Sequence, residues 1–326
     1  MTDRIQVAGT GLALSPLCLG GNRLGGDLDR DASFALLDAF AAAGGNFIDT
    51  AHVYADWLPG VERSCSERMI GRWLADRRPE GMVVATKIGH PPLGTPGVTR
   101  LDPRSLRQDV EEALENLGLA CLPLVYLHRD DDARPVEDIL GALEELVAGS
   151  MVARYAASNW SAKRLATSSE TARANGWQGF VANQAEWSLA RRTPGSAAAD
   201  LHAMDPAMID WHRRSGALAT PYSAQAKGYF DKLRAGTMDA ATANAYDNQA
   251  NRERGARLIE LSRRYDAAPT EIMLALFRDM PFPVIPVVGC RTPAQVASSF
   301  RGQALDLAPE DRAAFAADLG LDLLSP

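Results

Sequence analysis

Four side chains with acid–base chemistry follow short apolar runs within the first 130 residues. Asp49, Lys87 and His128 each end one of these runs, and Tyr54 stands just beyond the first. If the runs are neighbouring parallel strands, all four side chains meet at the edge where the strands end. A phenol has a pKa near ~10, and an adjacent ammonium stabilises the phenolate and lowers that value. Lys87 is predicted to lower the pKa of Tyr54 in this way.

This combination suits proton transfer to a carbonyl. Asp49 would pair with Lys87 and keep it charged, His128 would orient the carbonyl, and Tyr54 would donate the proton as general acid. Taken singly, the same residues are a structural ion pair, a half-buried aromatic and a core histidine. Their joint position at three successive run ends favours catalysis.

The elements that must position these residues alternate along the whole chain. Apolar runs lie near residues 17–20, 46–49, 83–87, 124–128, 152–157, 180–184, 217–221 and 284–288, with amphipathic stretches between them. Eight such units predict an α/β fold, a (β/α)8 barrel formed by residues 1–326 as a single domain. A doubly wound dinucleotide fold competes with it, but the glycines at 20–26 lack the G-x-G-x-x-G spacing.

Local start and stop signals of helices also support the barrel. Asp102 and Pro103 begin a helix that Gly118 ends, and another helix follows Pro135. Residues 5–7 and 12–14 predict an N-terminal β-hairpin that plugs the far end of the barrel. Three long segments, 55–65, 190–206 and 229–251, predict loops over the C-terminal mouth.

Composition excludes several classes of partner. The formal net charge of −7 argues against binding to nucleic acid or to an anionic membrane surface. No apolar run approaches the ~20 residues that span a bilayer. The four cysteines lack metal-ligand spacing, so we expect no metal site and reduced thiols in a cytoplasmic protein.

The string of motifs resembles the aldo-keto reductase family over nearly the whole chain. Besides the four residues above, 66–71 resembles the S-E-x-x-I-G that opens the family's second helix, and 154–160 resembles its strand-five signature. The resemblance implies that Ser158, Asn159 and Gln184 hold the nicotinamide carboxamide and that Tyr222 stacks on the ring. It also assigns to the cofactor site Gly21, Asn22, Ser223, Gln225, Lys227, Gly289 and Ser299.

The adenosine end departs from the family pattern. Thr292 and Gln295 have the spacing of a capping box, which presents a helix N-terminus that attracts phosphate. The resemblance implies that Arg291 pairs with the 2′-phosphate of NADPH. Gln295 stands where a second cation often occurs, so Arg291 is expected to act alone, and Ser298 and Ser299 replace a Glu-Asn pair. NADPH is the expected cofactor, with NADH as the alternative.

Substrate choice rests on aromatic residues near the mouth. Trp57, Trp160 and Trp187 are the predicted substrate contacts, and Ala55 follows the tyrosine where the family usually has glycine. A large, weakly charged pocket suits a sugar-like or a bulky carbonyl.

The expected function is reversible NAD(P)H-dependent reduction of such an aldehyde or ketone, a small-molecule substrate. Two alternatives stay open. One is a nucleotide-binding regulator like the potassium-channel β-subunits of the same family. The other is an aldolase in which Lys87 forms a Schiff base.

Overall fold

Eight short parallel strands form the centre of the molecule in the computed structural model, which describes residues 4–95, 97–198, 200–278 and 280–321. The strand order is β10-β3-β4-β5-β6-β7-β8-β9. A bridge between Ala219 and Val284, just ahead of β10, closes the sheet on itself. The strands are β3 (Cys18–Gly20), β4 (Phe47–Asp49), β5 (Val83–Ile88), β6 (Leu124–Leu127), β7 (Tyr155–Ser158), β8 (Ala182–Gln184), β9 (Leu218–Ala219) and β10 (Val287–Val288).

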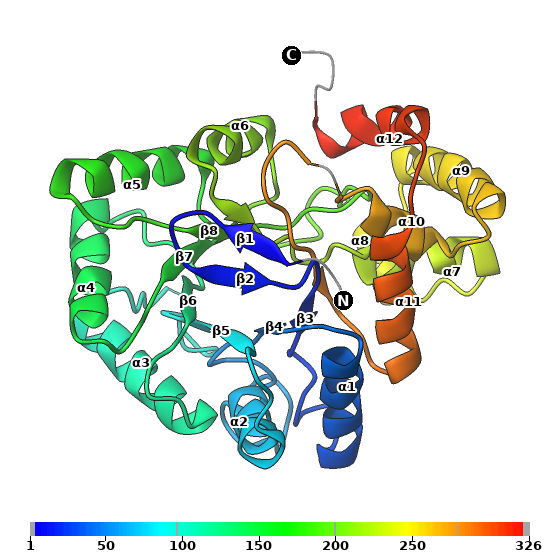
Figure 1. Ribbon diagram of the computed structural model, residues 1–326. Coiled ribbons are helices and arrows are strands. Elements are labelled where there is room, and N and C mark those ends of the chain that lie inside the picture. Colours follow the sequence, from blue (N-terminus) through cyan, green and yellow to red (C-terminus); the bar gives the residue numbers. More distant parts are fainter. Residues whose placement is uncertain (1–3, 96, 199, 279, 322–326) are drawn as a thin grey trace.

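Helices form a ring around these strands, as Figure 1 shows. The architecture is the predicted (β/α)8 barrel. The helices are α1 (Arg30–Ala42), α2 (Cys65–Arg77), α3 (Pro103–Leu117), α4 (Val136–Ala148), α5 (Ala162–Asn175), α6 (Pro206–Ser215), α7 (Tyr229–Ala235), α8 (Ala240–Tyr246), α9 (Gln249–Arg264), α10 (Pro269–Ala275), α11 (Pro293–Ala304) and α12 (Pro309–Ala316). None of those in the described ranges is long and apolar enough to cross a bilayer.

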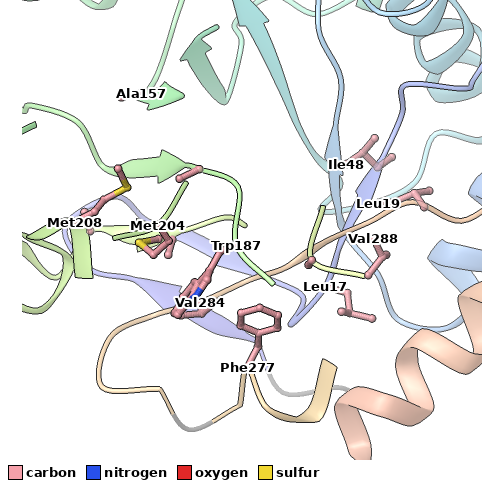
Figure 2. Packing of buried hydrophobic residues seen from close by; sticks show 14 of the residues in the cluster. Leu17, Leu19, Ile48, Ala157, Trp187, Met204, Met208, Phe277, Val284 and Val288 are labelled. Carbon is pink, nitrogen blue, oxygen red and sulfur yellow. The ribbon is translucent and has the colours of Figure 1, made fainter. Parts of the chain in front are cut away.

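Helix α3 shows how local sequence fixes the element bounds. Asp102 accepts a hydrogen bond from the amide of Ser105, Pro103 occupies the first helical position, and Gly118 ends the helix in the left-handed conformation with φ 65°. These are the start and stop that the sequence predicts. Figure 2 shows part of the main cluster of buried hydrophobic residues. Leu19, Ile48 and Val288, from three adjacent strands, belong to this cluster.

The N-terminal hairpin is present as predicted. Strands β1 (Ile5–Val7) and β2 (Leu12–Leu14) pair antiparallel, with Ile5 opposite Leu14. In Figure 1 the hairpin lies across the barrel. Val7 and Leu14 join a second apolar cluster with inward-facing strand residues such as Phe47. The hairpin therefore covers one end of the barrel interior.

One predicted loop is largely helical. The segment 229–251 contains α7, α8 and the start of α9. Asp239 accepts a hydrogen bond from the amide of Thr242, and Asn248 accepts one from that of Asn251, so each caps a helix that the polar composition hides. The strand expected at 152–157 is shorter than predicted and begins at Tyr155.

Candidate active site

Lys87 lies at the centre of a hydrogen-bonded cluster at the carboxyl ends of β4 and β5. Its Nζ donates to both carboxylate oxygens of Asp49 at 2.6 and 2.7 Å, to the carbonyl of Thr50 at 3.0 Å and to the hydroxyl of Tyr54 at 2.8 Å. Asp49 and Lys87 are both about 1% exposed. The two side chains meet because β4 and β5 are paired neighbours, with Asp49 opposite Ala85.

A tight turn after β4 brings Tyr54 back over the strand ends. The amide of Tyr54 donates to the carbonyl of Ala51, and the amide of His52 donates to that of Lys87. Ala55 follows with φ 68°, the left-handed region that favours glycine. The family's usual glycine at this position has a physical reason here, and the chain accommodates alanine instead.

The protonation of Tyr54 differs from the sequence prediction. Burial raises the pKa of this phenol well above its ordinary value, and the charge of Asp49 and a 3.2 Å hydrogen bond to it act in the same direction. The predicted lowering by Lys87 does not occur, because burial and then the Asp49 carboxylate favour the neutral phenol. Burial also lowers the pKa of Lys87, and Asp49 counteracts that effect. Tyr54 is therefore a protonated phenol at neutral pH.

His128 completes the group from β6 as an uncharged imidazole. Burial lowers its pKa well below the ordinary value, and the cations Lys87 and Arg129 add to the effect. Its buried Nδ1 has no hydrogen-bond partner among the described residues. The ring packs edge-on against Tyr54, with centroids 6.0 Å apart, and against His90 at 4.7 Å. The sequence reasoning missed His90, although it stands two residues beyond the end of β5.

A continuous cavity of about 1060 Å³ opens over these side chains. Its size accommodates a dinucleotide and a small carbonyl together. Most residues that the resemblance assigned to the cofactor contribute to its walls, namely Asn22, Ser158, Asn159, Gln184, Tyr222, Ser223, Gln225, Lys227, Gly289, Arg291, Gln295 and Ser299. Gly21 is not among the lining residues, and its neighbour Gly20 is.

Four side chains above the cluster form a polar patch at the ends of β7, β8 and β9. Tyr222 donates to Asn159 Oδ1 at 3.0 Å, and the Asn159 amide donates to Ser158 Oγ at 3.2 Å. Gln184 Nε2 donates to Asp49 Oδ1 at 2.9 Å. Asn159 does not cap α5, because Ser161 does. These donors and acceptors suit an amide such as the nicotinamide carboxamide.

The turn after β9 has an unusual backbone. Ser223, Ala226 and Lys227 all have positive φ, at 54°, 45° and 55°, and Gly228 follows at 71°. Non-glycine residues seldom adopt this conformation, and clusters of them mark ligand sites. Successive amides in such turns form concave anion sites, so the turn fits a pyrophosphate.

The far end of the cavity lies at the start of α11. Thr292 accepts a hydrogen bond from the amide of Gln295 as predicted, but Gln295 Oε1 accepts from the amide of Arg291 at 2.6 Å and not from that of Thr292. The expectation that Arg291 acts alone stays a prediction: Arg23 also lines this cavity, but it is paired with Asp27, which links it to Arg291.

The three predicted tryptophan contacts have different surroundings. Trp57 is 51% exposed on the loop after β4, with its ring centroid 6.3 Å from that of Tyr54. Trp160 is fully buried and donates to the carbonyl of Arg129. Trp187 packs against Phe277, as Figure 2 shows, and donates to the carbonyl of Leu319. None of the three contributes to the described lining of the catalytic cavity.

A second buried polar group, which the sequence reasoning missed, supports the site from behind. Glu67, at the start of α2, is completely buried. It accepts hydrogen bonds from Thr86, the neighbour of Lys87, from Asn116 at 2.9 Å and from His52 at 3.3 Å. Burial alone lowers the pKa of His52, but its hydrogen bond to Glu67 and the charge of that carboxylate outweigh this and raise it. The network connects α2 and α3 to the turn after β4 that carries Tyr54, which we call the tyrosine turn.

Known proteins provide independent support. Residues 16–317 match the model of the aldo/keto reductase family. A norsolorinic acid reductase of Emericella nidulans is 29% identical over 92% of this chain and 77% of its own length. An aryl-alcohol dehydrogenase [NADP(+)] of Phanerodontia chrysosporium is 34% identical over 56% of this chain and 51% of its own. An uncharacterized oxidoreductase, YrpG, of Bacillus subtilis is 28% identical over 92% and 91%.

Proposed function

We propose that Tyr54, Lys87, Asp49 and His128 carry the proton transfer of the reaction. The chain belongs to the aldo/keto reductase family and is a nicotinamide-dependent oxidoreductase of carbonyl compounds. The observation that supports the proposed proton transfer most is the placement of Lys87 Nζ within 2.8 Å of both the tyrosine hydroxyl and the aspartate. This contact joins a proton donor to the charge that stabilises its conjugate base.

A nicotinamide dinucleotide in this site would supply or accept the hydride. In reduction, the hydroxyl of Tyr54 turns from Asp49 and gives its proton to the carbonyl oxygen, which becomes an alkoxide as the carbon is reduced. The raised pKa of the phenol does not oppose this step, because an alkoxide is far more basic than a phenolate. Lys87 then faces the phenolate at hydrogen-bond distance and stabilises it.

Asp49 and His128 have separate tasks. Asp49 holds the Lys87 ammonium with two hydrogen bonds, which fixes it below the phenol and keeps it protonated despite burial. A protonated, fully paired lysine is a poor nucleophile, so this arrangement does not favour Schiff-base chemistry. His128, as a neutral imidazole beside Tyr54, can donate one hydrogen bond to the substrate oxygen and orient it.

The cofactor would lie along the cavity. Ser158, Asn159 and Gln184 would hold the carboxamide, and Tyr222 would cover the nicotinamide ring. The 223–228 turn would hold the pyrophosphate. Arg291, next to α11, would pair with the 2′-phosphate, so we propose NADPH as the better cofactor. A guanidinium forms bidentate hydrogen bonds with phosphate, which supports this choice.

The substrate is proposed to be an aromatic carbonyl rather than a sugar. The rings of Trp57, Tyr54, His128 and His90 form an unbroken series of edge-on contacts beside the reaction centre. Both imidazoles are uncharged at neutral pH, since burial lowers the pKa of His90 as well as that of His128. Tyr54 and His128 line the catalytic cavity, and such neutral rings favour flat apolar substrates. Relatives whose names refer to aryl alcohols and to norsolorinic acid agree with this choice.

Three variants test the catalytic roles. Tyr54→Phe should reduce kcat for aryl aldehydes by about 10²–10⁴-fold and leave NADPH binding close to wild type. Lys87→Met should be as damaging, and the double variant should cost little more than either alone, because the residues act as one unit. Tyr229→Phe, which removes a hydroxyl bonded to Asp247 outside the cavity, is the matched control and should keep its activity. Retention of more than about a tenth of kcat in Tyr54→Phe would exclude this tyrosine as the acid.

A separate titration tests the cofactor. Arg291→Ala should weaken NADPH binding by about 1.5–3 kcal/mol, the range for a hydrogen bond to a charged group, and leave NADH almost unchanged. Arg301→Ala, on α11 and paired with Glu271, is the control. Nucleotide fluorescence measures both affinities, and equal losses for NADPH and NADH would contradict the assignment of Arg291.

A further inference from the structure

We propose that Asp27 competes with the 2′-phosphate of the dinucleotide for Arg291 and so limits the preference for NADPH over NADH. The inference rests on the proposed function, because it requires Arg291 to be the partner of that phosphate. It concerns a specificity-determining residue outside the proton-transfer group.

One carboxylate connects two cations at the edge of the cavity. Asp27 Oδ2 accepts a hydrogen bond from Arg23 and lies 3.6 Å from an Nη atom of Arg291. Arg23 and Asp27 belong to the loop after β3, and Arg291 belongs to the loop after β10, the neighbouring strand. Both arginines line the cavity. The carboxylate therefore holds the same guanidinium that a 2′-phosphate would engage.

The loop that carries Asp27 is closed by its own backbone contacts and packs on the turn that carries Tyr54. Leu24 and Leu28 form a bridge, and the amides of Gly26 and Leu28 both donate to the carbonyl of Arg23. A side chain at Gly26 would come within 2.8 Å of the Cβ of Ala55, so the loop packs directly on the tyrosine turn. Asp27 is presented to Arg291 by this packed backbone, and the contact does not depend on a long flexible segment.

Charge explains the direction of the effect. The 2′-phosphate of NADPH must share Arg291 with Asp27 or displace it, and the two anions repel each other. NADH has a neutral 2′-hydroxyl at the same position, which can donate a hydrogen bond to a carboxylate, the contact that acidic residues make in NAD-binding sites. Asp27 should therefore weaken NADPH binding without weakening NADH binding. Removing its charge also frees Arg23 as a second cation.

Titration of an isosteric variant tests the proposal. Asp27→Asn should tighten NADPH binding by about two- to fivefold, the range for an exposed ion pair, and leave NADH unchanged or slightly weaker. The gain should shrink in high salt. Asp31→Asn, nearby on α1 and paired with Arg30, removes an equal charge from the same region and should change neither affinity. Equal effects of Asp27→Asn and Asp31→Asn would overturn the proposal.

A double-variant cycle identifies the route of the effect. In an Arg291→Ala background, Asp27→Asn should tighten NADPH binding less than it does in wild type, because the contested cation is gone and only Arg23 and the lost repulsion still act. A gain of the same size in both backgrounds would overturn competition for Arg291. The fragments 2′,5′-ADP and 5′-AMP give the same comparison without any turnover. The role of Asp27 can therefore be tested even if the catalytic assignment fails. If Arg291→Ala weakens NADPH but Asp27→Asn has no effect, the cofactor assignment stands and the role of Asp27 fails. If Arg291→Ala has no effect on NADPH, both fail.

Discussion

Tyr54 lies between an ammonium and a carboxylate, and the balance between them decides the charge of its phenol. Lys87 donates to the hydroxyl oxygen while Asp49 accepts its proton. Burial raises the pKa of Tyr54 and disfavours the phenolate. The phenol of Tyr54 is therefore protonated at neutral pH, and it gives up its proton only to a base stronger than the surrounding carboxylate.

This protonation state predicts a flat pH profile for carbonyl reduction. Reduction needs the protonated phenol, and a pKa above the ordinary value means that its ionisation removes no activity at neutral or mildly alkaline pH. Because the pKa of His128 is lowered, protonation of the imidazole also removes no activity at neutral pH. Single-turnover rates between about pH 6.5 and 9.5 measure the profile. Histidine ordinarily titrates at the lower end of this range, near ~6.5, and tyrosine just above its upper end, near ~10. A fall centred near pH 7–8 would instead indicate the lowered phenol pKa that the sequence suggests.

The residues that meet at strand ends were predictable, and the direction of other side chains was not. Asp49, Lys87 and His128 follow successive apolar runs, so parallel pairing alone brings them together. Trp160 and Trp187 stand next to motif residues, but packing turns both indoles into the core. The link from Arg23 to Arg291 through Asp27 joins opposite ends of the chain, and only the closed sheet reveals it.

At the scale of elements, the turn that carries Tyr54 depends on a strained alanine. Ala55 has φ 68° and is fully buried. The left-handed conformation costs an alanine roughly 1–2 kcal/mol. A glycine would remove this cost but lose a buried methyl worth about 0.8 kcal/mol and some backbone order worth about 0.5–1 kcal/mol. The two sides nearly cancel.

We therefore expect Ala55→Gly to leave the free energy of unfolding within about 0.5 kcal/mol of wild type, since these terms offset each other. Ala156→Gly, a matched buried alanine in β7 with no positive φ, should cost about 1.5 kcal/mol or more, because it lacks the strain relief. Urea unfolding of both variants measures the difference. Equal costs at the two positions would contradict the strain at Ala55.

The buried pair of His52 and Glu67 makes a second element-scale prediction, for stability against pH. Because the pKa of His52 is raised in the fold, its contribution is complete below the ordinary histidine value of 6.5 and is lost as the pH rises through the higher folded value. Glu112 and Arg63 also face this imidazole, and Asp109 acts on it at longer range. The free energy of unfolding should therefore decline above pH 6.5 in wild type.

Glu67→Gln should destabilise the protein by about 1–3 kcal/mol at pH 6, the cost of a disrupted buried hydrogen bond, and should flatten this decline. Glu111→Gln, on the exposed face of α3, is the control and should do neither. Urea titrations of wild type and both variants at pH 6 and 9 measure the two effects. A decline that survives intact in Glu67→Gln would show that another group causes it.

The elements themselves were predictable where the hydrophobic period is long and the caps are explicit. Helix α3 has both Asp102 and Gly118, and its bounds agree with prediction. Helices α7 and α8 have seven residues each, too few to show a period against their polar surroundings. Helices this short are marginal alone, so packing against the rest of the molecule must add to the local cap that Asp239 gives α8.

At the scale of the whole molecule, the hairpin seals the barrel interior. Leu14 is fully buried in the inner cluster, so Leu14→Ala should lower the free energy of unfolding by about 2–5 kcal/mol through the cavity it leaves. The value of kcat should not change, because Leu14 lies on the hairpin and does not line the catalytic cavity. Leu12→Ala, which removes a partly buried side chain from the same strand, should cost less. Thermal unfolding and initial rates measure both, and a loss of kcat in the folded Leu14 variant would contradict the separation of plug and site.

Because the hairpin covers one end of the barrel, the order in which cofactor and substrate bind is also restricted. The catalytic side chains lie in the same cavity as the residues proposed to hold the dinucleotide, so both reactants would bind in one continuous cavity. A carbonyl bound first against Tyr54 would obstruct the nicotinamide, whereas a nicotinamide held first by Asn159 and Gln184 would leave the space beside Tyr54 open to the carbonyl. Arrival in a fixed order follows, with the alcohol leaving before the spent nucleotide. In steady-state kinetics, the nucleotide product should then inhibit competitively against the nucleotide substrate, and the alcohol should not.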